Sequence, residues 1–177
     1  MKIKSLAGII AGLGVALSSA IAPATAQDKT NNTYYCAQLD GGWNTFVNTP
    51  RGRIKLINWA NEFSPDWTPQ KRCSAVSQRF QKFLDAGNLK YIRTGNINNQ
   101  PVLCVANMRG GSCPNNNVLV TLKPEADPER VLIELLDFRR SVSGKTLTLS
   151  ADDPGFYADG EFYVDVDKFL DTVPVNN

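Results

Sequence analysis

Four cysteines constrain the fold of this chain more strongly than any other feature. They are Cys36, Cys73, Cys104 and Cys113, and an even number of cysteines in an exported chain indicates disulfides. Four cysteines allow three pairings. The interval "CVANMRGGSC" contains a Gly-Gly pair that can fold the chain back, so we favour Cys104–Cys113, which leaves Cys36–Cys73. The chain-entropy relation assigns these bonds about 3 and about 4 kcal/mol respectively.

The start of the chain indicates export through the inner membrane. Lys2 and Lys4 precede the uncharged apolar run "LAGIIAGLGVALSSAIA", and Ala24 and Ala26 form a small-x-small cleavage signal. We therefore expect residues 1–26 to be a signal peptide and Gln27 to be the mature N-terminus. An uncleaved anchor is the alternative, since a membrane span needs about 20 apolar residues. Gly, Ala and Ser dilute the apolar run, which favours cleavage.

The charge of the chain argues against a nucleic-acid partner. The full sequence has 19 basic and 17 acidic residues, and cleavage would remove Lys2 and Lys4, which leaves equal numbers. Nucleic-acid binders normally carry a basic excess. The remaining charge is unevenly distributed. Most of the charged residues in 51–93 are basic, and most of those in 151–171 are acidic. We favour the interpretation in which the two segments face each other or face water. The alternative is that each binds a charged partner.

The clearest element is an amphipathic helix over residues 69–86. Thr68 is a good N-cap, Pro69 suits the first helical position, and Gly87 suits the C-cap. Apolar residues recur at helical spacing between them. Cys73 lies on this apolar stripe, whereas Lys71 and Arg72 lie off it. We therefore expect the Cys73 thiol to point inward, towards strand residues such as Cys36.

The other expected elements are strands and a second helix. Strands are predicted at 33–39, 43–49, 53–60, 117–123 and 145–150, and a helix at 128–140. In 53–60, Ile54 and Leu56 are expected on one face and Ile57 and Trp59 on the other. Segments 89–97 and 100–106 flank Asn98-Asn99 and predict a hairpin.

The segment "EFYVDVDKF", residues 161–169, alternates apolar and polar residues. This pattern predicts a half-buried strand with Phe162, Val164 and Val166 inward. The order of elements predicts an α+β fold, with a mostly antiparallel sheet packed against two helices and two disulfides. We expect a single domain over 33–171, preceded by a mobile segment at 27–32 and followed by a tail at 172–177.

Catalytic and metal chemistry find little support in the residue types. The chain has no histidine, which excludes a Ser-His-Asp triad, and its cysteines lack zinc-site spacing. We expect no enzyme activity, no cofactor and no metal. The alternative is a histidine-free hydrolase that acts on a glycan through paired carboxylates, either Asp152 with Asp153 or Asp165 with Asp167. Calcium binding by the alternating acids is a weaker alternative, since the chain lacks an EF-hand loop.

Two groups of residues are candidates for ligand or surface contact. The first is the tryptophans Trp43, Trp59 and Trp67, for which core packing is the simpler interpretation. Two tryptophans on one exposed face would instead favour a glycan or protein ligand. The second group is a basic strip that could contact an anionic membrane surface; it consists of Arg51, Arg53 and Lys55. A protein complex is the other candidate partner, and the oligomeric state stays open.

The chain resembles the circadian oscillating polypeptide family of cyanobacteria from about Cys36 to Arg139. The segments that carry the resemblance are "TPRG" at 49–52, "INWANEF" at 57–63, "WTPQKRCSAVSQRFQKF" at 67–83, "LKYIRTGNINNQPVLCV" at 89–105, "LVTLKP" at 119–124 and "ERVLIELLDFR" at 129–139. The resemblance implies an exported or membrane-associated protein in the periplasm, thylakoid lumen or medium, and the four cysteines fit the family pattern. It supplies no active-site residues. The founding member is named for rhythmic abundance, a property of regulation.

Overall fold

The structure is a computed structural model that describes residues 31–60, 64–135 and 153–175. It contains two antiparallel sheets and three helices within these ranges, together with both expected disulfides, Cys36–Cys73 and Cys104–Cys113. The α+β prediction is therefore confirmed. The expected signal peptide, the strand at 145–150 and the end of the helix at 128–140 lie outside the described residues.

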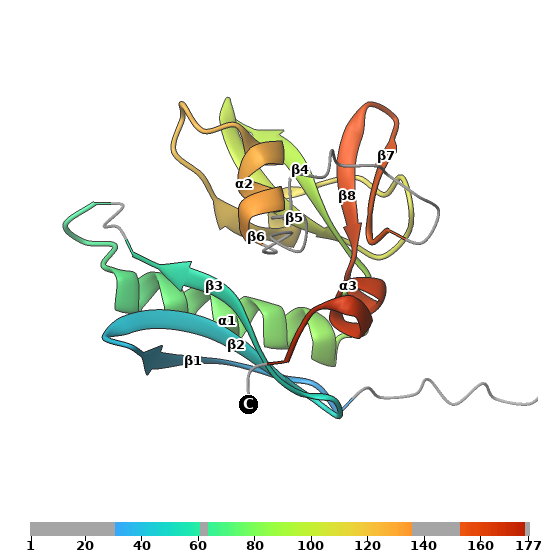
Figure 1. Ribbon diagram of the computed structural model, residues 1–177. Coiled ribbons are helices and arrows are strands. Elements are labelled where there is room, and N and C mark those ends of the chain that lie inside the picture. Colours follow the sequence, from blue (N-terminus) through green and yellow to red (C-terminus); the bar gives the residue numbers. More distant parts are fainter. Residues whose placement is uncertain (1–30, 61–63, 136–152, 176–177) are drawn as a thin grey trace, which may run out of the picture.

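The first sheet has three strands in the order β1-β2-β3. They are β1 (Thr33–Leu39), β2 (Gly42–Thr49) and β3 (Gly52–Trp59), and helix α1 (Pro69–Asp85) runs alongside this sheet (Figure 1). The Tyr34 ring stacks on Phe80 of α1 at 4.9 Å between ring centroids. The disulfide from Cys36 to Cys73 links the same two elements, so β1 and α1 are joined by a covalent bond as well as by packing.

Helix α1 begins and ends close to the predicted residues. The Thr68 side chain accepts a hydrogen bond from the Lys71 backbone N–H, Pro69 occupies the first turn, and Gly87 follows the helix with a φ of +69°. A left-handed φ suits glycine, which has no Cβ to clash with the backbone. Cys73 is fully buried on the inner face of the helix. The expectation of an inward-pointing thiol is therefore confirmed.

Strand β3 departs from the predicted alternation because it contains a β-bulge. The cross-strand register shifts between Thr45, which pairs with Ile57, and Phe46, which pairs with Lys55, so Leu56 has no partner on β2. A bulge inserts one residue and changes the phase of the side chains that follow. Ile57 and Trp59 consequently join Ile54 and Leu56 in the core. The expectation that these residues divide between two faces is wrong.

The second sheet has five strands in the order β6-β5-β4-β8-β7. Strand β4 (Tyr91–Ile97) and strand β5 (Gln100–Ala106) form the predicted hairpin, with Asn98 and Asn99 both at positive φ. A short 3-10 helix η1 (Asn115–Asn117) leads into edge strand β6 (Val118–Thr121), and helix α2 (Pro128–Leu135) follows. Strands β7 (Gly155–Ala158) and β8 (Glu161–Asp165) complete the sheet, which lies above the first sheet in Figure 1.

The predicted strand over residues 161–169 is wrong in its second half. Strand β8 ends at Asp165, whose carboxylate accepts a hydrogen bond from the Lys168 backbone N–H and caps helix α3 (Val166–Thr172). Tyr163, expected to face outward, is fully buried. Strand β8 lies between β4 and β7 and is covered on both faces, so apolar alternation is not required there. The local capping preference of Asp165 then decides where the strand ends.

The acidic end of the chain lies against the basic segment. Lys90 contacts Asp167 at 3.5 Å between Nζ and Oδ2, and Arg93 contacts Glu161 at 3.5 Å between Nη2 and Oε2. The first pair is half exposed and contributes little to stability. It nevertheless shows that the two oppositely charged segments face each other here, as the favoured interpretation predicted. Within the expected tail at 172–177, Val173 is buried and Val175 packs against the core.

The burial of Tyr34 gives the fold a predicted sensitivity to alkaline pH. Its side chain is almost fully buried, and burial raises the pKa of the phenol, with a smaller contribution from the charge of Asp167. The unfolded chain ionises at its usual value of about 10. Stability from this group is therefore present below about pH 10 and is lost as the pH rises above it. Urea midpoints measured from about pH 8 to 11 should fall more steeply for the wild type than for Tyr34→Phe; equal slopes would contradict this.

Gly95 on β4 has no room for a side chain. A Cβ atom at this position would lie 2.5 Å from Sγ of Cys113 and 3.2 Å from Sγ of Cys104. Gly95→Ala should therefore lower the free energy of unfolding by about 1–3 kcal/mol, as overpacking does, or leave free thiols. The control is Gly42→Ala, whose Cβ would lie 3.3 Å from the end of the Asn58 side chain and at ordinary contact distance, 3.7 Å or more, from its other neighbours. Urea unfolding with thiol titration checks this, and equal stability of the two variants would refute it.

Candidate binding site

A pocket of about 260 Å³ lies between α1 and edge strand β6. The last residue of β3, the turn before α1, one half-buried side of α1 and the end of β6 all contribute to it. The residues that line it are Trp59, Trp67, Arg72, Ala75, Val76, Arg79, Val120 and Thr121. The structure therefore brings together two of the three predicted tryptophans, Trp59 and Trp67, and adds two arginines to them.

Trp59 forms a rigid part of the pocket wall. Only 4% of the residue is exposed, and its indole Nε1–H donates a hydrogen bond of 3.0 Å to Thr45 Oγ1. The Ser77 hydroxyl bonds to the same oxygen at 3.0 Å. This buried network fixes the orientation of the indole ring, because each polar atom would lose a partner if the ring turned. Core packing is thus the main role of Trp59, as the simpler interpretation held.

Arg72 lies over the Trp59 ring, with its guanidinium carbon 4.6 Å from the ring centroid. This geometry is a cation–π contact, which holds the guanidinium against an aromatic wall. Partial burial lowers the pKa of Arg72 from its usual value. The usual pKa of arginine is so high that the side chain keeps its charge at neutral pH despite this shift. The pocket therefore contains a partly desolvated positive charge in a fixed place.

Trp67 is the exposed aromatic residue of the pocket. Its exposed fraction is 46%, which is high for a tryptophan. The backbone holds it in place, because its N–H donates a 3.0 Å hydrogen bond to the Ser64 carbonyl and the next residue is the N-cap of α1. An exposed indole on a fixed backbone beside a cavity offers a stacking surface at low entropic cost.

Arg79 adds a second positively charged side chain to the pocket lining. It follows Arg72 by seven residues, two helical turns along the same side of α1. Its Nη1 donates a 2.9 Å hydrogen bond to the Leu119 carbonyl of β6. The guanidinium has further N–H donors beyond the one used. Arg72 and Arg79 are the charged residues among the described ones that line the pocket.

Arg51 of the predicted basic strip has a structural contact. Its Nη1 donates hydrogen bonds to the carbonyls of Leu170 at 2.6 Å and Val173 at 3.3 Å. These carbonyls lie at the end of α3, where backbone acceptors lack partners within the helix. Arg51 therefore ties the β2–β3 turn to the C-terminal helix.

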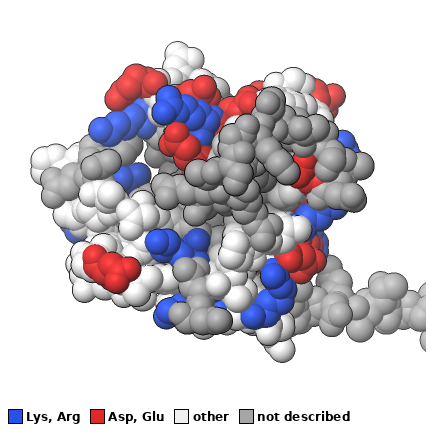
Figure 2. All heavy atoms as spheres, in the orientation of Figure 1, with Lys and Arg blue, Asp and Glu red and all other residues white. Residues whose placement is uncertain are grey.

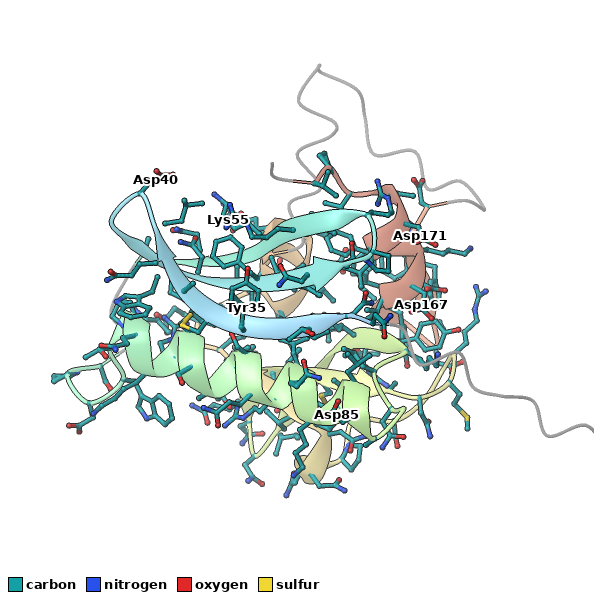
Figure 3. The ribbon with its side chains drawn as sticks, turned by 90° about the horizontal axis from the view of Figure 1, so that it is seen from below. Tyr35, Asp40, Lys55, Asp85, Asp167 and Asp171 are labelled. Carbon is teal, nitrogen blue, oxygen red and sulfur yellow. A yellow bond between two sulfur atoms is a disulfide. The ribbon has the colours of Figure 1, made fainter. Side chains whose placement is uncertain are left out.

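Arg53 and Lys55 share the outer face of the first sheet. The Arg53 guanidinium lies 5.3 Å from the centroid of the Phe46 ring, and Lys55 is the cross-strand partner of Phe46. Tyr35 is the partner of Phe46 on β1, so it lies on the same face as Lys55; both are labelled in Figure 3. On the molecular face of Figure 2, basic and acidic side chains are interspersed. Neither basic residue lines the pocket, and Trp43 does not line it either.

The predicted carboxylate pairs are not part of the pocket. Asp165 caps α3 and Asp167 contacts Lys90, while Asp152 lies outside the described residues. Among the described residues, no group of His, Cys, Asp and Glu could hold a metal ion. Within the same ranges, no helix is both long and apolar enough to cross a membrane.

Sequence reasoning missed the two arginines and the contribution of β6. It placed Arg72 off the buried stripe of α1 without assigning it a contact, and it did not consider Arg79. Their spacing of seven residues, on a helix that begins two residues after Trp67, is a signal that could have found them. The edge strand could not have been found in this way, because its approach to α1 depends on how the two sheets pack.

Comparison with known proteins adds a family but no activity. No curated protein and no solved structure matches the chain. The family model described as "Circadian oscillating protein COP23" matches residues 33–171. The match covers both sheets and all four cysteines, and it confirms the resemblance noted in the sequence. The chain therefore belongs to the circadian oscillating protein COP23 family.

Proposed function

We propose that the mature chain is an exported, non-enzymatic binding domain whose ligand site is the pocket between α1 and β6. The observation that carries this proposal is the exposed Trp67 beside a cavity that also contains two positioned arginines. Exposed aromatic residues next to a cavity are costly to keep in water and are typical of contact sites. Disulfides are compatible with an exported protein, and the sequence of the leader supports export.

The arrangement of carboxylates favours binding over hydrolysis. Glycoside hydrolysis needs two carboxylates that face each other across a substrate. Asp165 and Asp167 instead make a helix cap and an ion pair, and the described pocket contains arginines in place of acids. The α1–β6 pocket could orient and hold a ligand, but its described side chains include no carboxylate, histidine or lysine that could act as a base for a hydrolytic step.

The test uses the disulfide-bonded mature domain and a panel of small ligands. The panel contains anionic, neutral and cationic aromatic compounds and short oligosaccharides, and binding is followed by NMR chemical-shift changes. We expect changes centred on Trp67 and Thr121, and their loss in Trp67→Ala with the fold intact. A panel without any effect at the pocket, or release of reducing ends from an oligosaccharide that Asp165→Asn abolishes, would overturn the proposal.

Mass spectrometry of the exported protein should show a chain that begins at Gln27.

A further inference from the structure

We infer that the pocket binds a carboxylate carried on a planar apolar group, an inference that rests on the proposed function. Two features of the pocket together indicate this kind of ligand. It has an aromatic wall at Trp67 and two guanidinium groups, Arg72 and Arg79, that are held in fixed positions. A ligand that satisfies both must have an apolar face and an acceptor group with negative charge.

The arginines favour a carboxylate because of their shape and their environment. A guanidinium presents parallel N–H donors that match the two oxygens of a carboxylate. Arg72 is positioned by the Trp59 ring and Arg79 by the Leu119 carbonyl, so little side-chain entropy is lost when a ligand binds. Arg72 is also partly desolvated, which strengthens its attraction to an anion.

The size and lining of the pocket restrict the rest of the ligand. A volume of about 260 Å³ lies just below the range for ligand sites, about 300–1,000 Å³. It fits one or two fused rings, or the end group of a larger molecule. Apart from the indoles, Thr121 is the only uncharged polar side chain among the described lining residues. A neutral sugar would therefore find few partners for its hydroxyl groups, and a cation would be repelled.

The experiment compares three probes of nearly the same shape. The disulfide-bonded domain is titrated by calorimetry with 2-naphthoate, the neutral 2-naphthamide and the cationic 2-naphthylmethylammonium. We expect naphthoate to bind about tenfold more tightly than the amide, and the ammonium compound to bind more weakly than either. The advantage of naphthoate should shrink as salt is added, because the arginines remain partly exposed to solvent.

Charge variants on the same helix decide which residues bind the carboxylate. Arg72→Gln and Arg79→Gln should each weaken naphthoate binding about tenfold and leave amide binding nearly unchanged. Lys71→Gln makes the same charge change on the exposed side of α1, outside the pocket lining, and should have little effect. If Arg79→Gln loses its contact with β6 and fails to fold, Arg72→Gln decides the question. Arg72→Lys should recover only part of the affinity, since it keeps the charge but not the planar donors.

The outcomes separate this inference from the proposed function. Equal affinity for naphthoate and naphthamide at the pocket would overturn the carboxylate inference and leave the binding domain standing. Tighter binding of the ammonium compound, or a loss in Lys71→Gln as large as in Arg72→Gln, would overturn the inference as well. No binding of any probe or panel compound at the pocket would contradict both proposals.

Discussion

Replacing Cys36 and Cys73 together by alanine is expected to lower the free energy of unfolding by about 4 kcal/mol. The bond closes a loop with a sequence separation of 37 residues, and its loss gives the unfolded chain more conformational freedom. It also joins β1 to α1 at a position where Cys73 is fully buried. Since domains are typically stable by only about 5–15 kcal/mol, the variant should lose a large share of its stability.

The second disulfide provides the matched comparison. Cys104 and Cys113 are separated by nine residues, and the same relation gives about 3 kcal/mol for this shorter loop. Urea unfolding of the two double-alanine variants should therefore rank them in this order below the wild type. A Cys36/Cys73 variant as stable as the wild type would mean that the bond does not constrain the unfolded chain, and a reversed order would contradict the loop-length argument.

The parts of the fold that sequence predicted well are those decided by local preferences. Helix α1 was predicted almost to its last residue, because Thr68, Pro69 and Gly87 mark its two ends. The hairpin around Asn98 and Asn99 was predicted because asparagine tolerates positive φ. The disulfide pairing followed from two local facts, the short interval between Cys104 and Cys113 and the inward side of α1 that carries Cys73.

The parts that sequence did not predict depend on contacts between distant elements. The bulge at Leu56 changes the phase of β3 so that four apolar residues reach one core, and nothing in the alternation of "RIKLINW" shows it. Tyr163 is buried because β8 lies inside a sheet whose order is not the order of the sequence. The pocket could not be predicted for the same reason, since it lies between α1 and β6, which belong to different parts of the fold.

Phe80→Ala is the point substitution expected to destabilise the protein most, by about 3–5 kcal/mol. Phe80 is 3% exposed and stacks on Tyr34 of the first sheet. On its other side it borders a small internal cavity with residues of both sheets and α2, including Ile92, Leu103 and Leu132. One side chain therefore contacts both halves of the fold, and its removal leaves a void that neither half can fill alone.

The same position tests whether the two sheets unfold as one unit. One hydrophobic cluster contains buried residues from both sheets and from all three helices, so unfolding should be a single transition. In urea unfolding, Phe80→Leu should keep the wild-type dependence on urea concentration and lower the free energy of unfolding by less than about 1.5 kcal/mol. Trp67→Ala, at the exposed pocket wall, should change the free energy of unfolding by no more than about 0.5 kcal/mol. A second transition in Phe80→Ala would show that each sheet has its own stability, and that Phe80 couples them. The pocket lies across this junction, so ligand binding would then stabilise both sheets together.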